Sequence, residues 1–188
     1  MRRKVGILLS GRGSNMMSIV EASRAPDCPY EIALVASDKP DAPGIAWARA
    51  QGLAVFTHSP KGIPKPEYEA AIDSALRGAG VEVIALAGYM RLLSDDFVAR
   101  WRGKILNIHP SLLPKYKGLD THARALAMGD QVAGCSVHAV TEELDGGEVL
   151  GQAEVRIAAR DTAESLAERV LKEEHRLYPK VLAEFLCR

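Results

Sequence analysis

The sequence has few cysteines, few aromatic residues and no net charge. Its 188 residues include three cysteines and 5% aromatic residues, and lysine plus arginine equals aspartate plus glutamate at 24 each. Three widely spaced thiols fit neither a disulfide framework nor a zinc site. A balanced charge provides no long-range field toward nucleic acid or an anionic membrane. We therefore expect the partners to be small molecules, with no nucleic acid and no membrane among them.

Long hydrophobic runs are also missing. The longest runs, such as 83–87, are far shorter than the roughly 20 apolar residues of a membrane helix. The N-terminal run MRRKVGILLSGRG indicates a strand and a turn, without the cleavage site of a signal peptide. With 47% hydrophobic residues, the chain has enough apolar side chains for one buried core. We therefore expect a cytoplasmic protein with a single domain over residues 1–188.

Short apolar runs alternate with segments of helical periodicity along the chain. This alternation predicts an α/β fold, with a mostly parallel twisted sheet and helices on both of its faces. A segment rich in proline and glycine, 59–66, is expected to be a loop. The active cleft should lie at the carboxyl ends of the strands. The predicted strands are 4–10, 32–37, 55–57, 83–87, 105–108, 134–140 and 149–157, and the predicted helices are 16–23, 44–51, 68–77, 95–101, 121–128 and 162–186.

A glycine-rich turn follows the first predicted strand. Gly11 and Gly13 allow a tight turn, and Ser14, Asn15 and the free amides of the next helix can donate to an anion such as phosphate. The dinucleotide fingerprint would require a third glycine where Met16 stands, and the Gly-Lys-Ser/Thr ending of a P-loop is absent. The alternative is a structural turn in which Ser14 caps the helix.

An amide and an imidazole stand two positions apart at the end of a later strand. Asn107 and His109 would point to the same side of that strand and into one cleft. Pro110 and Pro114 then turn the chain into a rigid loop, where catalytic groups are often found. The alternative is an ordinary histidine at a strand end.

The remaining titratable residues permit fewer conclusions. Asp145 precedes two glycines between the last two predicted strands, and near His109 it would favour the protonated imidazole; alone it could serve only a turn. His138 is expected to be packed or hydrogen-bonded within its strand, and His122 to support the loop beyond Gly118; a role as ligand or base is the alternative for both. The histidine spacing favours no metal site. Cys135 lies in an apolar strand and is expected to be a packed thiol, with a nucleophilic role as the alternative.

Four blocks of sequence together resemble the folate-dependent formyltransferases. These blocks are SGRGSN at 10–15, LAGYMRL at 86–92, NIHPSLLPKYKGLDTH at 107–122, and SVH at 136–138 leading to ELDGG at 143–147. They occur in the right order and span most of the chain. Within that family, SGRGSN and HPSLLPKYKGLDTH point to members that act on glycinamide ribonucleotide.

The resemblance implies a Rossmann-like formyltransferase fold and a specific reaction. The formyl group of 10-formyltetrahydrofolate would pass to the amine of glycinamide ribonucleotide, giving formylglycinamide ribonucleotide and tetrahydrofolate in de novo purine biosynthesis. The ribonucleotide would bind in the N-terminal part, and the folate in the C-terminal part with the catalytic loop. The protein would be a monomer or a homodimer and would need no metal.

The resemblance also assigns the site residues. The catalytic residues would be Asn107, His109 and Asp145. The ribonucleotide would be bound by Gly13, Ser14, Asn15 and Glu174. The folate would be bound by Lys65, Met90, Arg91, Leu92, Leu93, Asn107, Thr141, Glu142, Glu143, Leu144 and Asp145. Lys65 stands where relatives carry an arginine for the glutamate tail, and a lysine lacks the bidentate geometry of a guanidinium.

Three alternative functions can be compared with the sequence. A formyl-folate hydrolase would be expected to carry a regulatory domain, and a methionyl-tRNA formyltransferase an RNA-binding domain; 188 residues leave room for neither. A non-catalytic nucleotide-binding or sensor module would use the phosphate turn without the set Asn107, His109 and Asp145. Formyl transfer, by contrast, needs donors directed at a developing oxyanion and a group that moves a proton, and this set offers both.

Overall fold

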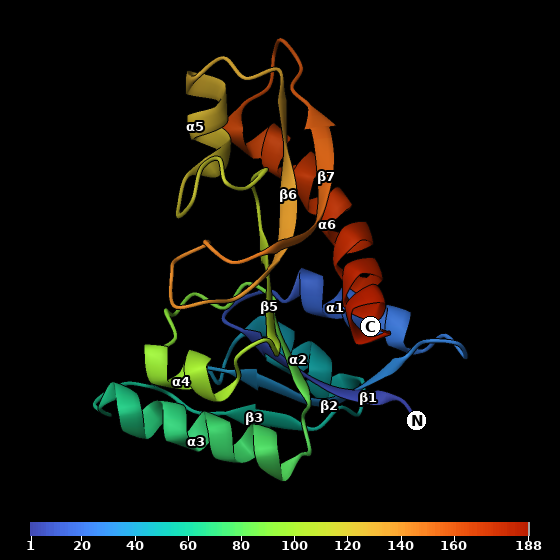
Figure 1. The fold of residues 1–188 in the computed structure, drawn as a ribbon, viewed down its shortest axis with the longest axis vertical. Helices are drawn as coiled ribbons and strands as arrows, with labels where there is room; N and C mark the ends of the chain where they lie inside the picture. The colour runs from blue at the N-terminus through green and yellow to red at the C-terminus, as the bar shows by residue number, and fades with distance from the viewer. Residues whose placement is uncertain (188) are drawn as a thin grey trace.

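A seven-stranded sheet forms the centre of the protein (Figure 1). The structure is a computed structural model that describes residues 1–187. The strands are β1 (Arg3–Leu9), β2 (Tyr30–Ser37), β3 (Val55–Thr57), β4 (Val83–Leu86), β5 (Ile105–His109), β6 (Val132–Ala139) and β7 (Val149–Arg156). The helices are α1 (Ser14–Ser23), α2 (Pro43–Ala50), α3 (Lys65–Gly78), α4 (Asp95–Arg100), α5 (Thr121–Ala127) and α6 (Ala163–Leu186).

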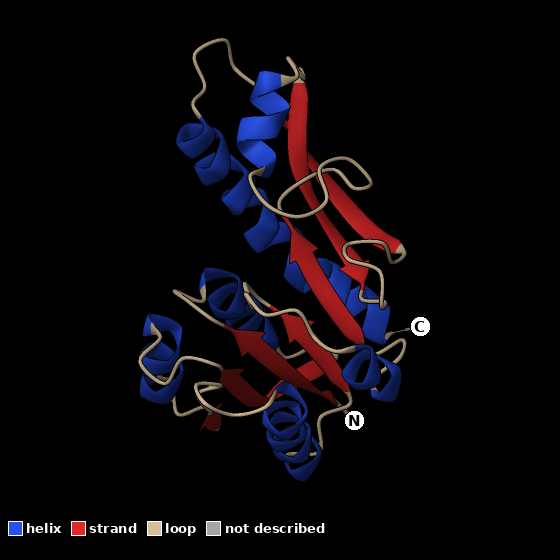
Figure 2. Cartoon of the chain, turned by 90° about the vertical axis from the view of Figure 1, so that its left-hand side faces the viewer, coloured by secondary structure: helices blue, strands red, loops and turns tan. Residues whose placement is uncertain are grey.

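The sheet is mostly parallel, as the alternation predicted. Its strand order is β3-β2-β1-β4-β5-β6-β7; β1 to β5 pair in parallel, and β6 and β7 join antiparallel. β2 and β3 are added on one side of β1, and β4 and β5 on the other side, so the strand order reverses between β1 and β4. In such sheets, ligands bind beyond the carboxyl ends of the strands at this switch point. β5 connects this parallel part to β6 and β7, which extend away from it alongside α6 (Figures 1 and 2).

Helices cover both faces of the sheet, as predicted. On β1, Ile7 belongs to the apolar cluster that includes residues of α1, α2 and α6, whereas Leu8 belongs to the cluster that includes residues of α3 and α4. On β4, Ala85 and Ile84 divide in the same way. Successive side chains of a strand point to opposite faces, so a strand covered on both sides is apolar throughout.

Helix α6 connects the two parts of the sheet. Thr162 and Ser165 form a reciprocal capping box at its start, which satisfies two backbone donors. Further along, the buried hydroxyl of Tyr178 lies 3.1 Å from the carbonyl oxygen of Leu86 and 3.0 Å from that of Leu106. These contacts connect α6 to the end of β4 and to the start of β5, so the helix has a defined position beside the central strands.

Several predicted boundaries were wrong by one to three residues. α1 begins at Ser14, after Gly13 in the left-handed region (φ 74°), and no side chain in the part of the chain that the structure describes caps its start, so the alternative in which Ser14 caps this helix does not hold. α3 begins at Lys65, inside the predicted loop 59–66, because proline is compatible with the first turn of a helix and Pro66 stands there. No helix within residues 1–187 is long and apolar enough to cross a membrane.

Gly134→Ala should lower the free energy of unfolding by about 2–3 kcal/mol, because overpacking a core strains its backbone. An added Cβ would lie 2.0 Å from the carbonyl oxygen of Ala153 and 2.7 Å from a methyl group of Leu112. Gly78→Ala is the matched control, because an added Cβ there meets nothing within 4 Å. Urea denaturation measures both variants, and equal stability of the two would contradict the close packing of β6 against β7.

Candidate active site

The end of β5 places Asn107 and His109 beside one another. Asn107 pairs in register with His138 of β6, and His109 with Ser136. The apolar neighbours Leu106 and Ile108 point into the core cluster shared with α6, so Asn107 and His109 share the other face. The prediction that the amide and the imidazole point to the same side of the strand is therefore confirmed. Pro110 follows at once, and the chain leaves the sheet there.

Asp145 comes from a distant loop and lies between two histidines. Its Oδ2 atom is 3.4 Å from Nδ1 of His109, and its Oδ1 atom is 3.6 Å from Nε2 of His138. The backbone N–H of Gly118 donates to the same carboxylate at 2.9 Å. Asp145 itself has a φ of 49°, and its side chain is only 8% exposed. The structure thus brings together the three residues Asn107, His109 and Asp145. It adds His138, which was expected to be packed or hydrogen-bonded but was not among the predicted site residues.

The hydrogen bonds of His138 determine how the Asn107 amide is oriented. Nδ1 of His138 lies 3.0 Å from the carbonyl oxygen of Ala139, so Nδ1 carries a proton. Burial lowers the pKa of His138, more than the Ala139 carbonyl and Asp145 raise it, and the ring is therefore neutral at pH 7. Nε2 then accepts a hydrogen bond from Nδ2 of Asn107 at 3.2 Å. The second N–H of the same amide remains for a ligand.

His109 is buried beside the cavity that Asn107 faces. Its Nε2 atom donates to the carbonyl oxygen of Tyr116 at 2.9 Å, and Nδ1 faces Asp145. Asn107, His138 and Asp145 line the cavity, whereas His109 is not among its lining residues. The expectation that Asn107 and His109 both point into one cleft is therefore only half met. The reason is that the loop after Pro110 folds back over the imidazole through Tyr116.

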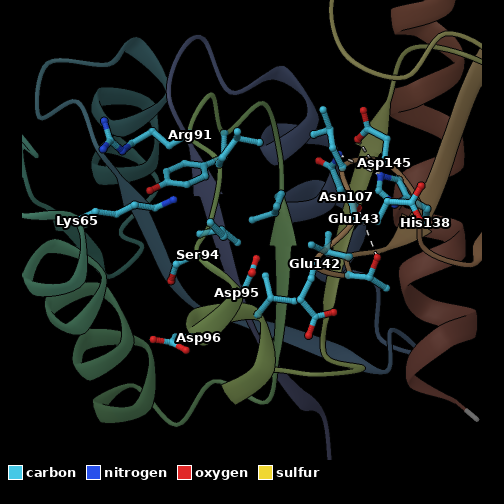
Figure 3. Close-up of a pocket in the computed structure, with 18 residues that line it drawn as sticks. Lys65, Arg91, Ser94, Asp95, Asp96, Asn107, His138, Glu142, Glu143 and Asp145 are labelled. Carbon is cyan, nitrogen blue, oxygen red and sulfur yellow. Dashed lines mark hydrogen bonds and ion pairs between the residues drawn. The ribbon is translucent and has the colours of Figure 1, made fainter.

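A cavity of about 670 Å³ lies along the carboxyl ends of β4 and β5 (Figure 3). Charges of both signs line it: Lys65 and Arg91 lie on one side, and the lining also contains five carboxylates, Asp95, Asp96, Glu142, Glu143 and Asp145. Ten of the eleven predicted folate-binding residues line this cavity. Met90, which is 73% exposed, is the one that does not. Sequence reasoning missed the lining residues Leu86, Tyr89, Ser94, Asp95, Asp96, Val98, His138 and Val140.

The glycine turn after β1 approaches α2 and α6. A Cβ on Gly13 would lie 3.1 Å from the Cα of Gly44, so only glycine allows this contact. Nδ2 of Asn15 donates to Oε2 of Glu174 at 2.7 Å, and both residues are buried. Oδ1 of Asn15 is a buried acceptor without a partner among the described residues. Asn15 and Glu174, predicted to bind one ligand, are therefore in direct contact.

Glu174 also connects the two halves of the site. Burial raises the pKa of its carboxyl group, while the hydrogen bond from Asn15 and the nearby His109 lower it. His109 is thus close enough to influence Glu174 on one side and Asp145 on the other. The imidazole lies between the glycine turn and the large cavity, which is where a reaction between two bound molecules would occur.

Cys135 and His122 have environments that fit their expected structural roles. Cys135 is fully buried, and burial raises the pKa of its thiol to about 12, so it is a packed side chain and not a nucleophile. His122 stands in the first turn of α5, and burial lowers the pKa of its imidazole. The hydroxyl of its neighbour Thr121 donates to the carbonyl oxygen of Pro110 at 2.7 Å, which connects α5 to the loop after β5.

The fold and this convergence of polar side chains define a transferase of the formyl transferase class. A family model described as formyl transferase matches residues 3–182, and the chain belongs to this family. The phosphoribosylglycinamide formyltransferase of Haemophilus influenzae is 41% identical over 184 residues, which cover 97% of this chain and 87% of that protein. A crystal structure of phosphoribosylglycinamide formyltransferase from Brucella melitensis superposes with a TM-score of 0.96 at 51% identity, covering 100% of this chain and 97% of the other.

Longer relatives contain the same unit. The trifunctional purine biosynthetic protein adenosine-3 of Gallus gallus is 43% identical over 181 residues, which cover 95% of this chain but only 18% of that protein. The matched region is thus a whole protein in some relatives and a part of a larger one in others.

The free energy of unfolding should decrease as the pH falls below about 6.5. Burial is the first cause that lowers the pKa of His122, His138 and His175 from 6.5, so the unfolded chain binds protons there that the folded chain does not. The decrease in the free energy of unfolding is complete once the pH is below the lowered pKa values of these histidines. Glu174 has the opposite effect. Its pKa is raised from 4.5, so its contribution to the free energy of unfolding decreases as the pH rises from 4.5 to the raised pKa.

Urea denaturation between pH 7.5 and pH 5 measures this dependence. His138→Gln removes one of the three titrating groups, so its stability should depend less steeply on pH than that of the unsubstituted protein. An identical slope in the two proteins would show that His138 is not held neutral by its surroundings.

Proposed function

We propose that this protein transfers the formyl group of 10-formyltetrahydrofolate to the amine of glycinamide ribonucleotide, in the cytoplasm and as a monomer or a homodimer. The products are formylglycinamide ribonucleotide and tetrahydrofolate, and the reaction belongs to de novo purine biosynthesis. The observation that carries the proposal is the contact between His109 and the buried carboxylate of Asp145, at the junction of a glycine turn and a large cavity. Family membership and relatives named phosphoribosylglycinamide formyltransferase support this substrate pair.

The cavity suits a formyl donor with a flat ring and an anionic tail. Its volume of about 670 Å³ is within the range of small-molecule sites. Leu86, Leu93 and Val140 provide apolar surface, and the cations Lys65 and Arg91 lie on one side. The five carboxylates in the lining would repel an anionic tail and the two cations would attract it, so the tail extends toward Lys65 and Arg91. Met90 contributes through its backbone, since its side chain is exposed.

The glycine turn suits the ribonucleotide. The turn at Gly13 and the first amides of α1, at Ser14 and Asn15, provide donors for a phosphate group. Glu174 can accept hydrogen bonds from two hydroxyl groups of a ribose, and its contact with Asn15 places both groups at one ligand. The ribonucleotide amine then extends toward His109.

Formyl transfer requires an amine to attack the formyl carbon, with negative charge developing on the formyl oxygen. A proton then moves from the amine to the folate nitrogen as the bond between that nitrogen and the formyl carbon breaks, which releases tetrahydrofolate. Asn107 donates its free N–H to that oxygen, because His138 holds the other N–H. His109, when protonated, is the second donor once its ring turns from the Tyr116 carbonyl. Asp145 stabilises the protonated imidazole and accepts the proton of the amine, directly or through a water molecule. No acyl-enzyme is needed in this scheme.

A direct assay separates this function from its alternatives. The protein is incubated with 10-formyltetrahydrofolate, with and without glycinamide ribonucleotide, and loss of the formyl group is followed by absorbance. We expect turnover only when both compounds are present. Turnover without the acceptor would indicate a hydrolase, formylation of methionyl-tRNA would indicate the tRNA enzyme, and ribonucleotide binding without turnover would indicate a binding module.

His109→Ala and Asp145→Asn should each lower kcat by about 10²–10³-fold, the usual effect of losing an oxyanion donor or a general base. The KM values should change much less, because these groups act mainly in the transition state. Asp120→Asn is the control for the change from carboxylate to amide: its carboxylate lies in the loop between β5 and α5 and is exposed. Circular dichroism and urea denaturation check that the variants fold. A kcat within about threefold of the unsubstituted protein would remove either residue from the mechanism.

A further inference from the structure

The wall of the large cavity is formed mainly by a loop. Residues 88–94, here called the wall segment, connect β4 to α4, and five of them line the cavity: Tyr89, Arg91, Leu92, Leu93 and Ser94. A loop has no backbone ladder to hold its shape, so the geometry of this wall depends on other contacts. Two buried carboxylates that do not themselves line the cavity provide contacts at both ends of the segment.

The first contact is made at Met90. Its backbone N–H donates to Oγ of Ser10 at 2.9 Å, and the Ser10 hydroxyl donates to Oδ1 of Asp38 at 2.6 Å. Ser10 follows β1 and Asp38 follows β2, and they are 3% and 7% exposed. The hydroxyl has one proton, and Asp38 accepts it, so the oxygen of Ser10 is left as an acceptor for Met90. Asp38 thereby orients the group that holds the wall segment.

The second contact is made at Ser94. Its backbone N–H donates to Oε1 of Glu69 at 2.8 Å, and its hydroxyl donates to Oε2 of the same carboxylate. Glu69 stands on α3 and is 3% exposed. The Ser94 oxygen in turn accepts the backbone N–H of Phe97 and so caps α4. One carboxylate therefore determines where the wall segment ends and where α4 begins.

The arrangement leaves the middle of the wall segment available to a ligand. Within residues 1–187, the backbone N–H groups of Arg91, Leu92 and Leu93 have no hydrogen-bond partner in the protein. Side-chain contacts at Met90 and Ser94 hold the loop without using these donors. A ligand with acceptors on its edge can therefore meet the loop in one defined geometry.

We propose that Asp38 and Glu69 are positioning residues of the formyl-donor site, which hold the wall segment through Ser10 and Ser94. The inference rests on the proposed function for the identity of the ligand. Neither carboxylate is within the cavity lining, so their effect is on the shape of the cavity and not on contact with the donor. Glu69 is also 4.0 Å from Nζ of Lys65, but at this separation the hydrogen bonds to Ser94 are the stronger contacts.

The test compares alanine and amide variants at both positions. Asp38→Ala and Glu69→Ala should raise the KM for 10-formyltetrahydrofolate about tenfold, the loss expected when a hydrogen bond to a charged group is removed. The KM for glycinamide ribonucleotide and kcat should remain within about twofold. Asp38→Asn keeps an acceptor for the hydroxyl of Ser10, and Glu69→Gln keeps one of the two acceptors for Ser94. Asp38→Asn should therefore retain a KM within about threefold of the unsubstituted protein, and Glu69→Gln should be less impaired than Glu69→Ala.

Control variants and a second measurement distinguish an effect on the wall segment from a general loss of structure. Asp41→Ala and Glu67→Ala remove exposed carboxylates close in sequence and should leave all constants unchanged. Ser10→Ala removes one oxygen atom and tests the first contact if Asp38→Ala folds poorly. Amide hydrogen exchange should become faster at Met90 and Ser94 in the alanine variants while core strands stay protected.

Each outcome decides one question. Equal increases in both KM values, or amide variants as impaired as the alanine variants, would overturn the positioning roles. Binding of tetrahydrofolate, measured by calorimetry, does not require turnover; unchanged affinity in Glu69→Ala and Ser10→Ala would also overturn them. Absence of turnover in the unsubstituted protein would instead overturn the proposed function.

Discussion

The carboxylate of Asp145 is buried, and a buried carboxylate is stable only where polar groups surround it. His109 from β5, His138 from β6 and the backbone N–H of Gly118 supply those groups. Strand β5 with the loop that follows it, strand β6, and the loop that carries Asp145 therefore have to meet at one point. The antiparallel pairing of β5 with β6 brings the two histidines together, and the loops 110–120 and 141–148 close over them. The arrangement of the site follows from this one requirement.

The same site joins two halves of the molecule. The glycine turn belongs to β1 and α1, whereas Glu174 belongs to α6, and the hydrogen bond between Asn15 and Glu174 connects them. Tyr178, one turn further along α6, contacts the carbonyl oxygens of Leu86 at the end of β4 and of Leu106 near the start of β5. α6 thus connects the glycine turn to β5, which carries Asn107 and His109. Two small molecules bound on either side of His109 would meet at the imidazole.

The sequence predicted the strands, helices and parallel core because each depends on local periodicity, as Ile7 and Leu8 illustrate on β1. It also predicted Asn107, His109 and Asp145 as one set, but through the family resemblance and not through spacing. The role of His138 was missed because an antiparallel register, which places it opposite Asn107, leaves no local signal. The Tyr116 carbonyl that accepts from His109 could not be predicted either, since it depends on a left-handed residue (φ 55°) within a loop.

Buried carboxylates recur around the carboxyl ends of the strands, and two of them, Asp38 and Glu69, hold a loop through hydrogen bonds that the loop cannot obtain from a ladder. Asp38 orients Ser10, Glu69 receives Ser94, and Glu174 receives Asn15. An apolar residue at these positions would pack more favourably but would leave backbone or side-chain donors unpaired. Loops carry the binding groups because their amides are free, and the same freedom would leave their shape undefined. Ionised side chains with two acceptor oxygens resolve this conflict, since they hold the ends of a loop and leave its middle for the ligand.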